Sequence, residues 1–243
     1  MRVTVTGVAR HRTHHDSADP ALLSFLADVP AVHSHGPRTM NHDGTPIDRA
    51  VLRERLVAMR RALPVPARIG AAEALAHRLL ALPFAPKGGY VAGYWATNGE
   101  IALHAWQVQL PGDCRYCLPV LHDDGRLRFA PWRPGESLVT NRFGIPEPDV
   151  EPAALLEPEA MALVVAPLVA FDRAGHRLGM GGGWYDRSFA FRRLQPAPPW
   201  LVGAAFDEQQ VDAIAAESWD VPLDAVCTPM HFHDFRNCHP SSP

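Results

Sequence analysis

The sequence of 243 residues lacks any apolar run near the roughly 18 residues that a membrane-spanning helix needs. Its first residues also lack the apolar stretch of a secretory signal peptide. A large excess of charge of one sign is absent too, because the formal net charge is −3. Lysine occurs only once, as Lys87, so almost all of the positive charge is on arginine. These absences predict a cytoplasmic protein that binds no membrane and has no overall basic field for nucleic acid. Phosphate binding would have to come from local arginines.

Cysteine is scarce as well, at four residues: Cys114, Cys117, Cys227 and Cys238. The first two have the spacing of a redox or zinc motif. A redox pair normally opens a helix, however, and CRYCLPV is typical of a strand. The other two cysteines do not supply a second close pair for zinc. We therefore expect buried, reduced thiols, with a metal site as the alternative.

The amino-acid composition changes near residue 45 and divides the chain into two parts. Residues 1–44 are rich in His, Pro, Ser and Gly and contain one short apolar patch, ALLSFLADV. This composition predicts a disordered N-terminal extension, whose clustered histidines would bind metal only adventitiously. Residues 45–243 are expected to form a single α/β catalytic domain.

A helix signal opens that domain. Residues 45–48, Thr-Pro-Ile-Asp, offer an N-cap hydroxyl, a proline for the first turn and an acid three residues later. Apolar residues follow at helical spacing: Leu52, Leu56, Met59 and Leu63. Arginines project from the other faces, where a solvated basic face is the plain interpretation: Arg49, Arg53 and Arg60. A second helix is expected over residues 69–80.

Strands and helices then alternate. Strands are expected at residues 89–95, 114–120, 126–132, 161–172, 200–207 and 224–228. Helices are expected at residues 101–110, 184–193 and 208–218. This order predicts an α/β fold, with a mostly parallel sheet and helices on both faces, in a Rossmann-like three-layer sandwich. Ligands bind beyond the carboxyl ends of the strands in such sheets.

The stretch RLGMGGGWYDR, residues 177–187, follows the most apolar predicted strand and leads into a predicted helix. Without Cβ atoms, its glycines let phosphate oxygens reach backbone N–H groups near a helix N-terminus. The spacing fits neither a Walker loop, since no Gly-Lys-Ser follows, nor a dinucleotide fingerprint, which requires glycine at position 184. Asp186 is placed to bind Mg²⁺ together with phosphate oxygens. The stretch predicts a nucleoside triphosphate site, with a plain glycine-rich turn as the alternative.

Five segments together resemble the 5-formyltetrahydrofolate cyclo-ligase family, in that family's order. They are Arg49-Ala-Val-Leu52-Arg53, GYWATNGEI, FGIPEP, FDRAGHRLGMGGGWYDR and WDVPLDAV. The segments cover roughly residues 45–230, almost everything outside the N-terminal extension. Arg49 stands where lysine is common in the family, which keeps the charge but changes its geometry. Ala96 stands where bacterial relatives often have proline.

The resemblance implies a reaction. ATP and Mg²⁺ would drive cyclisation of 5-formyltetrahydrofolate to 5,10-methenyltetrahydrofolate, with ADP and phosphate released. ATP would phosphorylate the formyl oxygen, and N10 of the folate would then close the ring and expel phosphate. Such chemistry needs positioning and charge neutralisation rather than a protein nucleophile.

The resemblance also implies the residues of the site. Catalytic roles fall to Arg53 and Asp186, and Mg²⁺ binding to Asp186 and Asp224, with Asp220 a weaker candidate. The implied ATP-binding residues are Arg49, Arg53, Arg177, Leu178, Gly179, Met180, Gly181, Gly182, Gly183, Trp184 and Tyr185. The implied folate-binding residues are Trp95, Glu100, Met180, Gly181, Gly182, Gly183 and Trp184.

The implied partners are the small molecules 5-formyltetrahydrofolate and ATP, and we expect a monomer. Two other functions fit the same architecture. One is a non-catalytic regulator that binds folate and nucleotide, which the intact set of Arg53, Glu100, Asp186 and Asp224 disfavours. The other is an enzyme like a sugar-phosphate isomerase or a CoA-transferase. An isomerase would not require ATP, so nucleotide dependence distinguishes it.

Overall fold

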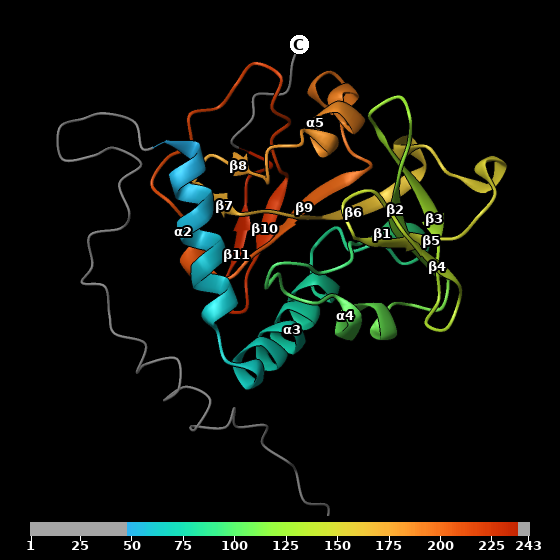
Figure 1. Cartoon of the computed structure of the whole chain (residues 1–243), viewed down its shortest axis with the longest axis horizontal. Coiled ribbons are helices and arrows are strands. Elements are labelled where there is room, and N and C mark those ends of the chain that lie inside the picture. Colours follow the sequence, from blue (N-terminus) through green and yellow to red (C-terminus); the bar gives the residue numbers. More distant parts are fainter. Residues whose placement is uncertain (1–47, 238–243) are drawn as a thin grey trace, which may run out of the picture. The chain divides into compact units, whose positions relative to one another are not determined.

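A seven-stranded sheet runs through the computed structural model, which describes residues 48–237 (Figure 1). The strand order is β11-β10-β9-β6-β1-β2-β3. The strands are β1 Gly89–Ala92, β2 Cys114–Leu121, β3 Leu127–Pro131, β6 Met161–Pro167, β9 Trp200–Ala204, β10 Ala225–Cys227 and β11 Phe232–Asp234. Neighbours from β10 to β2 are parallel, whereas the edge strands β11 and β3 pair antiparallel. The predicted mostly parallel sheet is confirmed.

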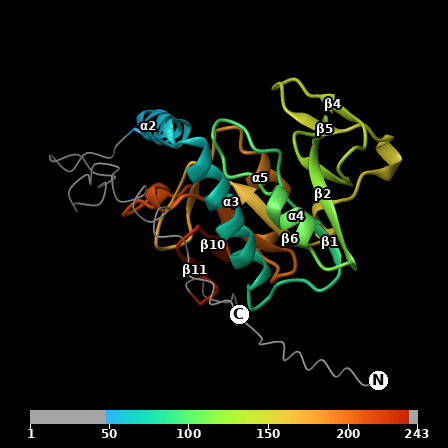
Figure 2. The ribbon, with the colours of Figure 1, turned by 90° about the horizontal axis from the view of Figure 1, so that it is seen from below.

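Helices α3 (Val65–Leu80) and α4 (His104–Gln109) cover one face of the sheet (Figure 2). Leu75 of α3 and Trp106 of α4 pack in one buried cluster with Leu163 and Val165 of β6. Because side chains alternate along a strand, Val164 points to the opposite face. Each fully buried side chain of this size contributes about 1.5–3 kcal/mol relative to exposure. This face therefore holds a large part of the core.

The opposite face is covered by shorter elements. Helix α5 (Trp184–Ser188) and the 3-10 helix η3 (Ala190–Arg193) lie there, and Phe189 between them packs with Val164. Helices on both faces, as predicted, are thus confirmed, although the second layer is thin.

Helix α2 (Arg49–Ala62) does not contact the main sheet through its apolar stripe. Its Leu52 and Leu56 pack against the small hairpin formed by β7 (Ala170–Phe171) and β8 (Arg177–Leu178). The helix and the chain after β6 are therefore held together at one edge of the fold.

A second hairpin projects beside β2. It consists of β4 (Leu138–Thr140) and β5 (Pro146–Pro148), and Glu147 accepts a hydrogen bond from the Leu121 backbone at 3.2 Å. Single-turn 3-10 helices complete the described elements: η1 Pro152–Ala154, η2 Pro158–Ala160 and η4 Asp207–Gln209.

Several predicted bounds were wrong. Helix α2 begins at Arg49 with Asp48 as its N-cap, whose side chain accepts from Ala50 N at 2.8 Å. Helix α3 begins at Val65, four residues before its predicted start, because Pro66 fits a first helical turn. The strand predicted over 161–172 ends at Pro167, since the chain then turns into the β7–β8 hairpin.

The helix predicted over residues 208–218 does not form beyond η4. Tertiary hydrogen bonds take its backbone instead, because Val211 N donates to Phe171 O and Ile214 N donates to a carboxylate oxygen of Asp172. The helix predicted over 184–193 is split into α5 and η3. The Ser188 hydroxyl at the break donates to Trp184 O and accepts from Leu127 N.

The predicted burial is confirmed for two of the three cysteines that the structure describes. Cys117 and Cys227 are buried, and burial raises the pKa of each thiol to about 12, which keeps it protonated. Cys114 is half-buried on the same strand as Cys117. Cys238 lies outside the described residues.

Residues 1–47, including Thr45 and the histidine-rich segment, also lie outside the described residues. The extension over 1–44 and the domain boundary after it therefore stay predictions. Between residues 48 and 237, no helix is both long and apolar enough to cross a membrane.

Candidate active site

A pocket of about 320 Å³ opens beyond the carboxyl ends of the parallel strands β1 and β6. The chain that continues from β1 lines it with Tyr94, Trp95, Thr97 and Glu100, and the chain after β6 lines it with Leu168. The tip of the β4–β5 hairpin, the start of α2, and residues between Arg177 and Asp186 also line it, with further residues from β2, β3 and the segment before β10. This is the place at which open α/β sheets bind ligands.

One end of the pocket is basic. Arg49 and Arg53 are four residues apart on α2, so they lie on the same face of the helix, and both line the pocket with Arg177. Burial, and then the charge of Arg49, lower the pKa of Arg53. The Arg49 Nε atom is buried and has no hydrogen-bond partner within the described part of the chain. Arg53 has no carboxylate partner within the described residues, whereas Arg49 pairs with Glu217 and Asp220, and Arg177 with Asp186. A guanidinium without such a partner suits an anionic ligand.

The glycine loop, residues 179–183, crosses the same end. Arg53 Nε donates to Gly179 O at 2.8 Å, which fixes the loop to α2. Gly181 has a φ of +96°, and a Cβ there would lie 3.7 Å from the Arg53 guanidinium. Gly183, at φ +63°, caps α5. The helix has only five residues, so we attribute the basic character to arginines and loop amides rather than to a helix terminus.

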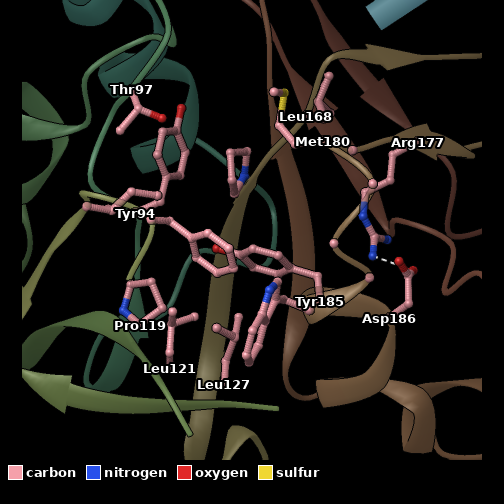
Figure 3. A pocket seen from close by; sticks show the side chains of 18 of the residues that line it. Tyr94, Thr97, Pro119, Leu121, Leu127, Leu168, Arg177, Met180, Tyr185 and Asp186 are labelled. Atoms are coloured by element: carbon pink, nitrogen blue, oxygen red, sulfur yellow. Dashed lines mark hydrogen bonds and ion pairs between the residues drawn. The ribbon is translucent and has the colours of Figure 1, made fainter. Parts of the chain in front are cut away.

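An ion pair closes the loop. Arg177 Nη2 lies 2.6 Å from Asp186 Oδ1, as Figure 3 shows, and the same oxygen accepts from Val221 N at 3.1 Å. Asp220, which directly precedes Val221, also lines the pocket and accepts from Arg49 Nη2 at 3.5 Å. Two carboxylates therefore flank the basic end.

The other end is apolar and aromatic. Figure 3 places Tyr94, Pro119, Leu121, Leu127 and Tyr185 together, away from the Arg177–Asp186 pair. This wall can take a flat, largely apolar ring system.

Phe143, at the tip of the β4–β5 hairpin, extends this wall. It lies edge-on to Trp184, with ring centroids 6.2 Å apart. The Asn141 side chain fixes the tip by accepting from Phe143 N at 2.9 Å and from Ile145 N at 3.1 Å.

Glu100 is the acidic group of the aromatic end. Its Oε2 accepts from Thr97 N at 2.8 Å, and its Oε1 lies 3.4 Å from Arg60 Nη2. Burial raises the pKa of Glu100, whereas the Thr97 and Arg60 donors oppose that rise. A nearly buried carboxylate that borders a pocket is placed to pair with donors on a ligand.

The structure brings most of the sequence-predicted residues into this one pocket. They are Arg49, Arg53, Trp95, Glu100, Arg177, Gly179, Met180, Gly181, Gly182, Gly183, Trp184, Tyr185 and Asp186. Leu178 is instead buried in the core beside α2. Arg60 is also buried, so the solvated basic face expected for α2 is wrong at that position.

Asp224 is not brought to the pocket. Its carboxylate accepts two hydrogen bonds from Arg192 Nη2, at 2.9 and 3.0 Å, and one from Leu201 N at 2.7 Å. These contacts fix the start of β10 against β9 rather than a ligand. Asp220, the weaker sequence candidate, lies in the pocket in its place.

Sequence reasoning gave no site role to Asn141, Phe143 and Ile145, although FGIPEP was recognised as a family segment. Tyr94 and Trp219 were also missed. The signal available in the sequence was an aromatic residue, Phe143, in a Gly/Pro-rich turn. In the structure, 57% of its surface is exposed.

Fold and site together define an α/β protein with a basic, glycine-lined pocket beyond its sheet and an aromatic wall facing it. Residues 47–229 match the model of the 5-formyltetrahydrofolate cyclo-ligase family. The chain therefore belongs to this family of enzymes.

Individual relatives agree with the family match. The chain is 38% identical to the 5-formyltetrahydrofolate cyclo-ligase of Escherichia coli K12 over 157 residues, which cover 63% of this chain and 85% of the relative. It is 33% identical to that of Mycolicibacterium smegmatis over 196 residues, covering 76% and 95%. The solved structure of Aquifex aeolicus 5,10-methenyltetrahydrofolate synthetase is similar at 28% identity, with a TM-score of 0.65 and coverage of 77% and 93%.

Proposed function

We propose that this protein cyclises 5-formyltetrahydrofolate to 5,10-methenyltetrahydrofolate with ATP and Mg²⁺, releasing ADP and phosphate. The observation that carries the proposal is the joining, in one pocket, of an arginine-rich glycine loop with an aromatic wall that ends in Glu100. A phosphate donor and a folate would then meet between the two ends. The names of the relatives support the same reaction.

The basic end would bind the phosphates of ATP. Arg49, Arg53 and Arg177 supply positive charge, and the open backbone at Gly179, where a Cβ would meet nothing within 4 Å, admits phosphate oxygens. Phosphoryl transfer depends mainly on positioning and on neutralising charge. We assign Arg53 and the loop 179–183 to that task.

The carboxylates at this end fit Mg²⁺. Within residues 48–237, no cluster of three or more His, Cys, Asp or Glu side chains is arranged to hold a metal alone. Mg²⁺ needs fewer protein ligands, since it usually takes one or two carboxylates with phosphates and waters. Asp186 and Asp220 would hold it, in place of the Asp186 and Asp224 pair expected from the sequence. When bound, Mg²⁺ neutralises charge on the transferring phosphate.

The aromatic end would hold the folate. The pterin edge presents a 2-amino group beside a ring N–H, a pair of donors that suits the two oxygens of Glu100. Trp95 and the Tyr94–Tyr185 wall would pack on the rings.

The proposed chemistry starts from a weak electrophile. The formyl oxygen attacks the γ-phosphorus of ATP and breaks the bond to the leaving oxygen of ADP. N10 then adds to the activated formyl carbon. The C–O bond breaks as phosphate leaves with that oxygen, and the proton of N10 is lost to solvent. The role of the pocket is to hold N10 and the phosphate donor on the two sides of the formyl group.

An omission assay tests the function. Purified protein is given 5-formyltetrahydrofolate, ATP and Mg²⁺, and the near-ultraviolet absorption of the methenyl product is followed. We expect product only when all three are present. Product without ATP, or none from folded protein with all three, would contradict the proposal.

A further inference from the structure

Arg60 is the largest buried polar side chain of α2, with 1% of its surface exposed. Its guanidinium donates from Nε to Asn98 O at 2.8 Å and from Nη1 to Leu168 O at 2.9 Å. The third nitrogen, Nη2, lies 3.4 Å from Glu100 Oε1. One planar group thus joins three segments of the pocket wall: α2, the turn of residues 97–100 and the chain after β6.

The turn of residues 97–100 has an unfavourable backbone conformation and needs outside contacts to hold Glu100 in place. Asn98 has a φ of +51° and Gly99 a φ of +78°, both in the left-handed region. A Cβ on Gly99 would lie 3.0 Å from Arg60 O, so the turn packs directly on the end of α2. Such backbone persists only where surrounding contacts hold it. Here Arg60 holds the Asn98 carbonyl, the Arg61 side chain donates to Asn98 Oδ1, and Glu100 N donates to Thr97 O.

We propose that Arg60 is a positioning residue for folate: it fixes the Glu100 carboxylate at the pocket wall and ties it to the helix that carries Arg49 and Arg53. The role of Glu100 toward folate rests on the proposed function. The placement of the carboxylate by Arg60 does not, because it is a property of the protein without ligand.

The charge of Arg60 also acts on the ionisation of Glu100. Burial raises the pKa of Glu100, and Arg60 is the cation that opposes this rise. The other groups that face Glu100 are the N–H and hydroxyl of Thr97, and the hydroxyls of Tyr94 and Tyr185, which are neutral at physiological pH because burial raises the pKa of each phenol. Removing the guanidinium therefore favours the protonated form of Glu100.

The experiment compares Arg60→Met with the wild-type protein and with Arg55→Met, a matched control at an exposed position of the same helix. Carbon-13 labelling of glutamate carboxyls allows Glu100 to be titrated by NMR in the ligand-free protein, with Glu100→Gln identifying the signal. We expect the titration midpoint of Glu100 to rise by about one pH unit or more in Arg60→Met. It should stay unchanged in Arg55→Met.

Kinetics add a second measurement. In Arg60→Met, the KM for 5-formyltetrahydrofolate should rise roughly tenfold, because the carboxylate is no longer held at the pocket wall. The rise should be larger at low pH than at high pH, because protonation of Glu100 adds to it. The KM for ATP should change much less. A variant that merely loosened the fold would raise both constants without this pH dependence.

Arg60→Lys provides a second test in case Arg60→Met does not fold. Its ammonium keeps the charge, but it cannot reach Asn98 O and Leu168 O as a planar fork. We expect a nearly unchanged midpoint for Glu100 with a raised folate KM. An unchanged midpoint and an unchanged folate KM in folded Arg60→Met, or a wild-type folate KM in Arg60→Lys, would overturn the proposal. No product from the wild-type protein would overturn the proposed function instead, and the NMR titration would still decide the role of Arg60.

Discussion

Arg177 and Asp186 clamp the two ends of the glycine loop, with Arg177 Nη2 2.6 Å from Asp186 Oδ1. The same oxygen accepts from Val221 N, so the pair also fixes the loop that carries Asp220. Between residues 48 and 237, no hydrogen bond engages Asp186 Oδ2. The carboxylate can therefore serve the loop through one oxygen and a ligand through the other.

Three aspartate variants separate the carboxylates proposed to bind Mg²⁺ from a structural one. Asp186→Asn and Asp220→Asn should each lower kcat by about 100-fold and raise the Mg²⁺ concentration needed for half-maximal rate, since each removes charge beside the phosphates. Asp224→Asn should leave the Mg²⁺ dependence unchanged and lower the free energy of unfolding by roughly 1.5–3 kcal/mol, because it weakens the bonds with Arg192.

Magnesium titrations of the rate, together with denaturant unfolding, give these quantities. If Asp224→Asn rather than Asp220→Asn changed the Mg²⁺ requirement, Asp224 and not Asp220 would be the metal ligand, which would contradict the proposal.

Gly181 and Gly135 offer a matched pair for the glycine loop. Both have a φ of +96°, so alanine at either position should destabilise the fold by a similar amount, roughly 1–3 kcal/mol. Only Gly181 lines the pocket, beside Arg53. We expect Gly181→Ala to raise the KM for ATP and Gly135→Ala to leave it unchanged. An equal KM for ATP in the two variants would show that the glycine loop does not bind the nucleotide.

The raised pKa of Glu100 leads us to expect that folate binding depends on pH. Burial raises the pKa of Glu100 above its ordinary 4.5, and pairing with the pterin donors needs the ionised form. Folate affinity should therefore be complete well above the raised pKa and be lost as the pH falls through it, at a higher pH than for an exposed glutamate.

Glu100→Gln should abolish this dependence and weaken folate binding by about 1.5–3 kcal/mol, because its amide turns a donor toward a donor. The KM for each substrate, measured from pH 5 to 8, checks both effects. A larger rise in the ATP constant than in the folate constant would argue against Glu100 as the pterin anchor.

The centre of the fold was predictable because its strands carry their own signal. Met161–Pro167 is apolar and rich in valine because both faces of this strand are covered. The glycines of residues 177–187 indicate a segment whose backbone a ligand can approach closely. The helix predicted over 208–218 failed for a reason that local sequence does not contain. Its amides bond Phe171 O and Asp172, about 40 residues earlier in the chain.

The site was predictable only in part for the same reason. Asp220 and Asp224 are four residues apart in similar sequence, and what separates them is Arg192, which takes the second and leaves the first at the pocket. The position of Arg60 along α2, relative to the apolar residues of that helix, is likewise one that an exposed arginine could occupy. Its burial follows from a turn near residue 98 that α2 meets only in the folded chain.

Transfer of isotope tests the central claim, that ATP activates the formyl oxygen, most directly. 5-Formyltetrahydrofolate labelled with ¹⁸O in the formyl group is converted with unlabelled ATP in unlabelled water, and the released phosphate is analysed by mass spectrometry. Because the formyl oxygen becomes a phosphate oxygen before N10 closes the ring, we expect each phosphate formed to carry one ¹⁸O atom. Unlabelled phosphate, with the ¹⁸O found in water, would contradict the account.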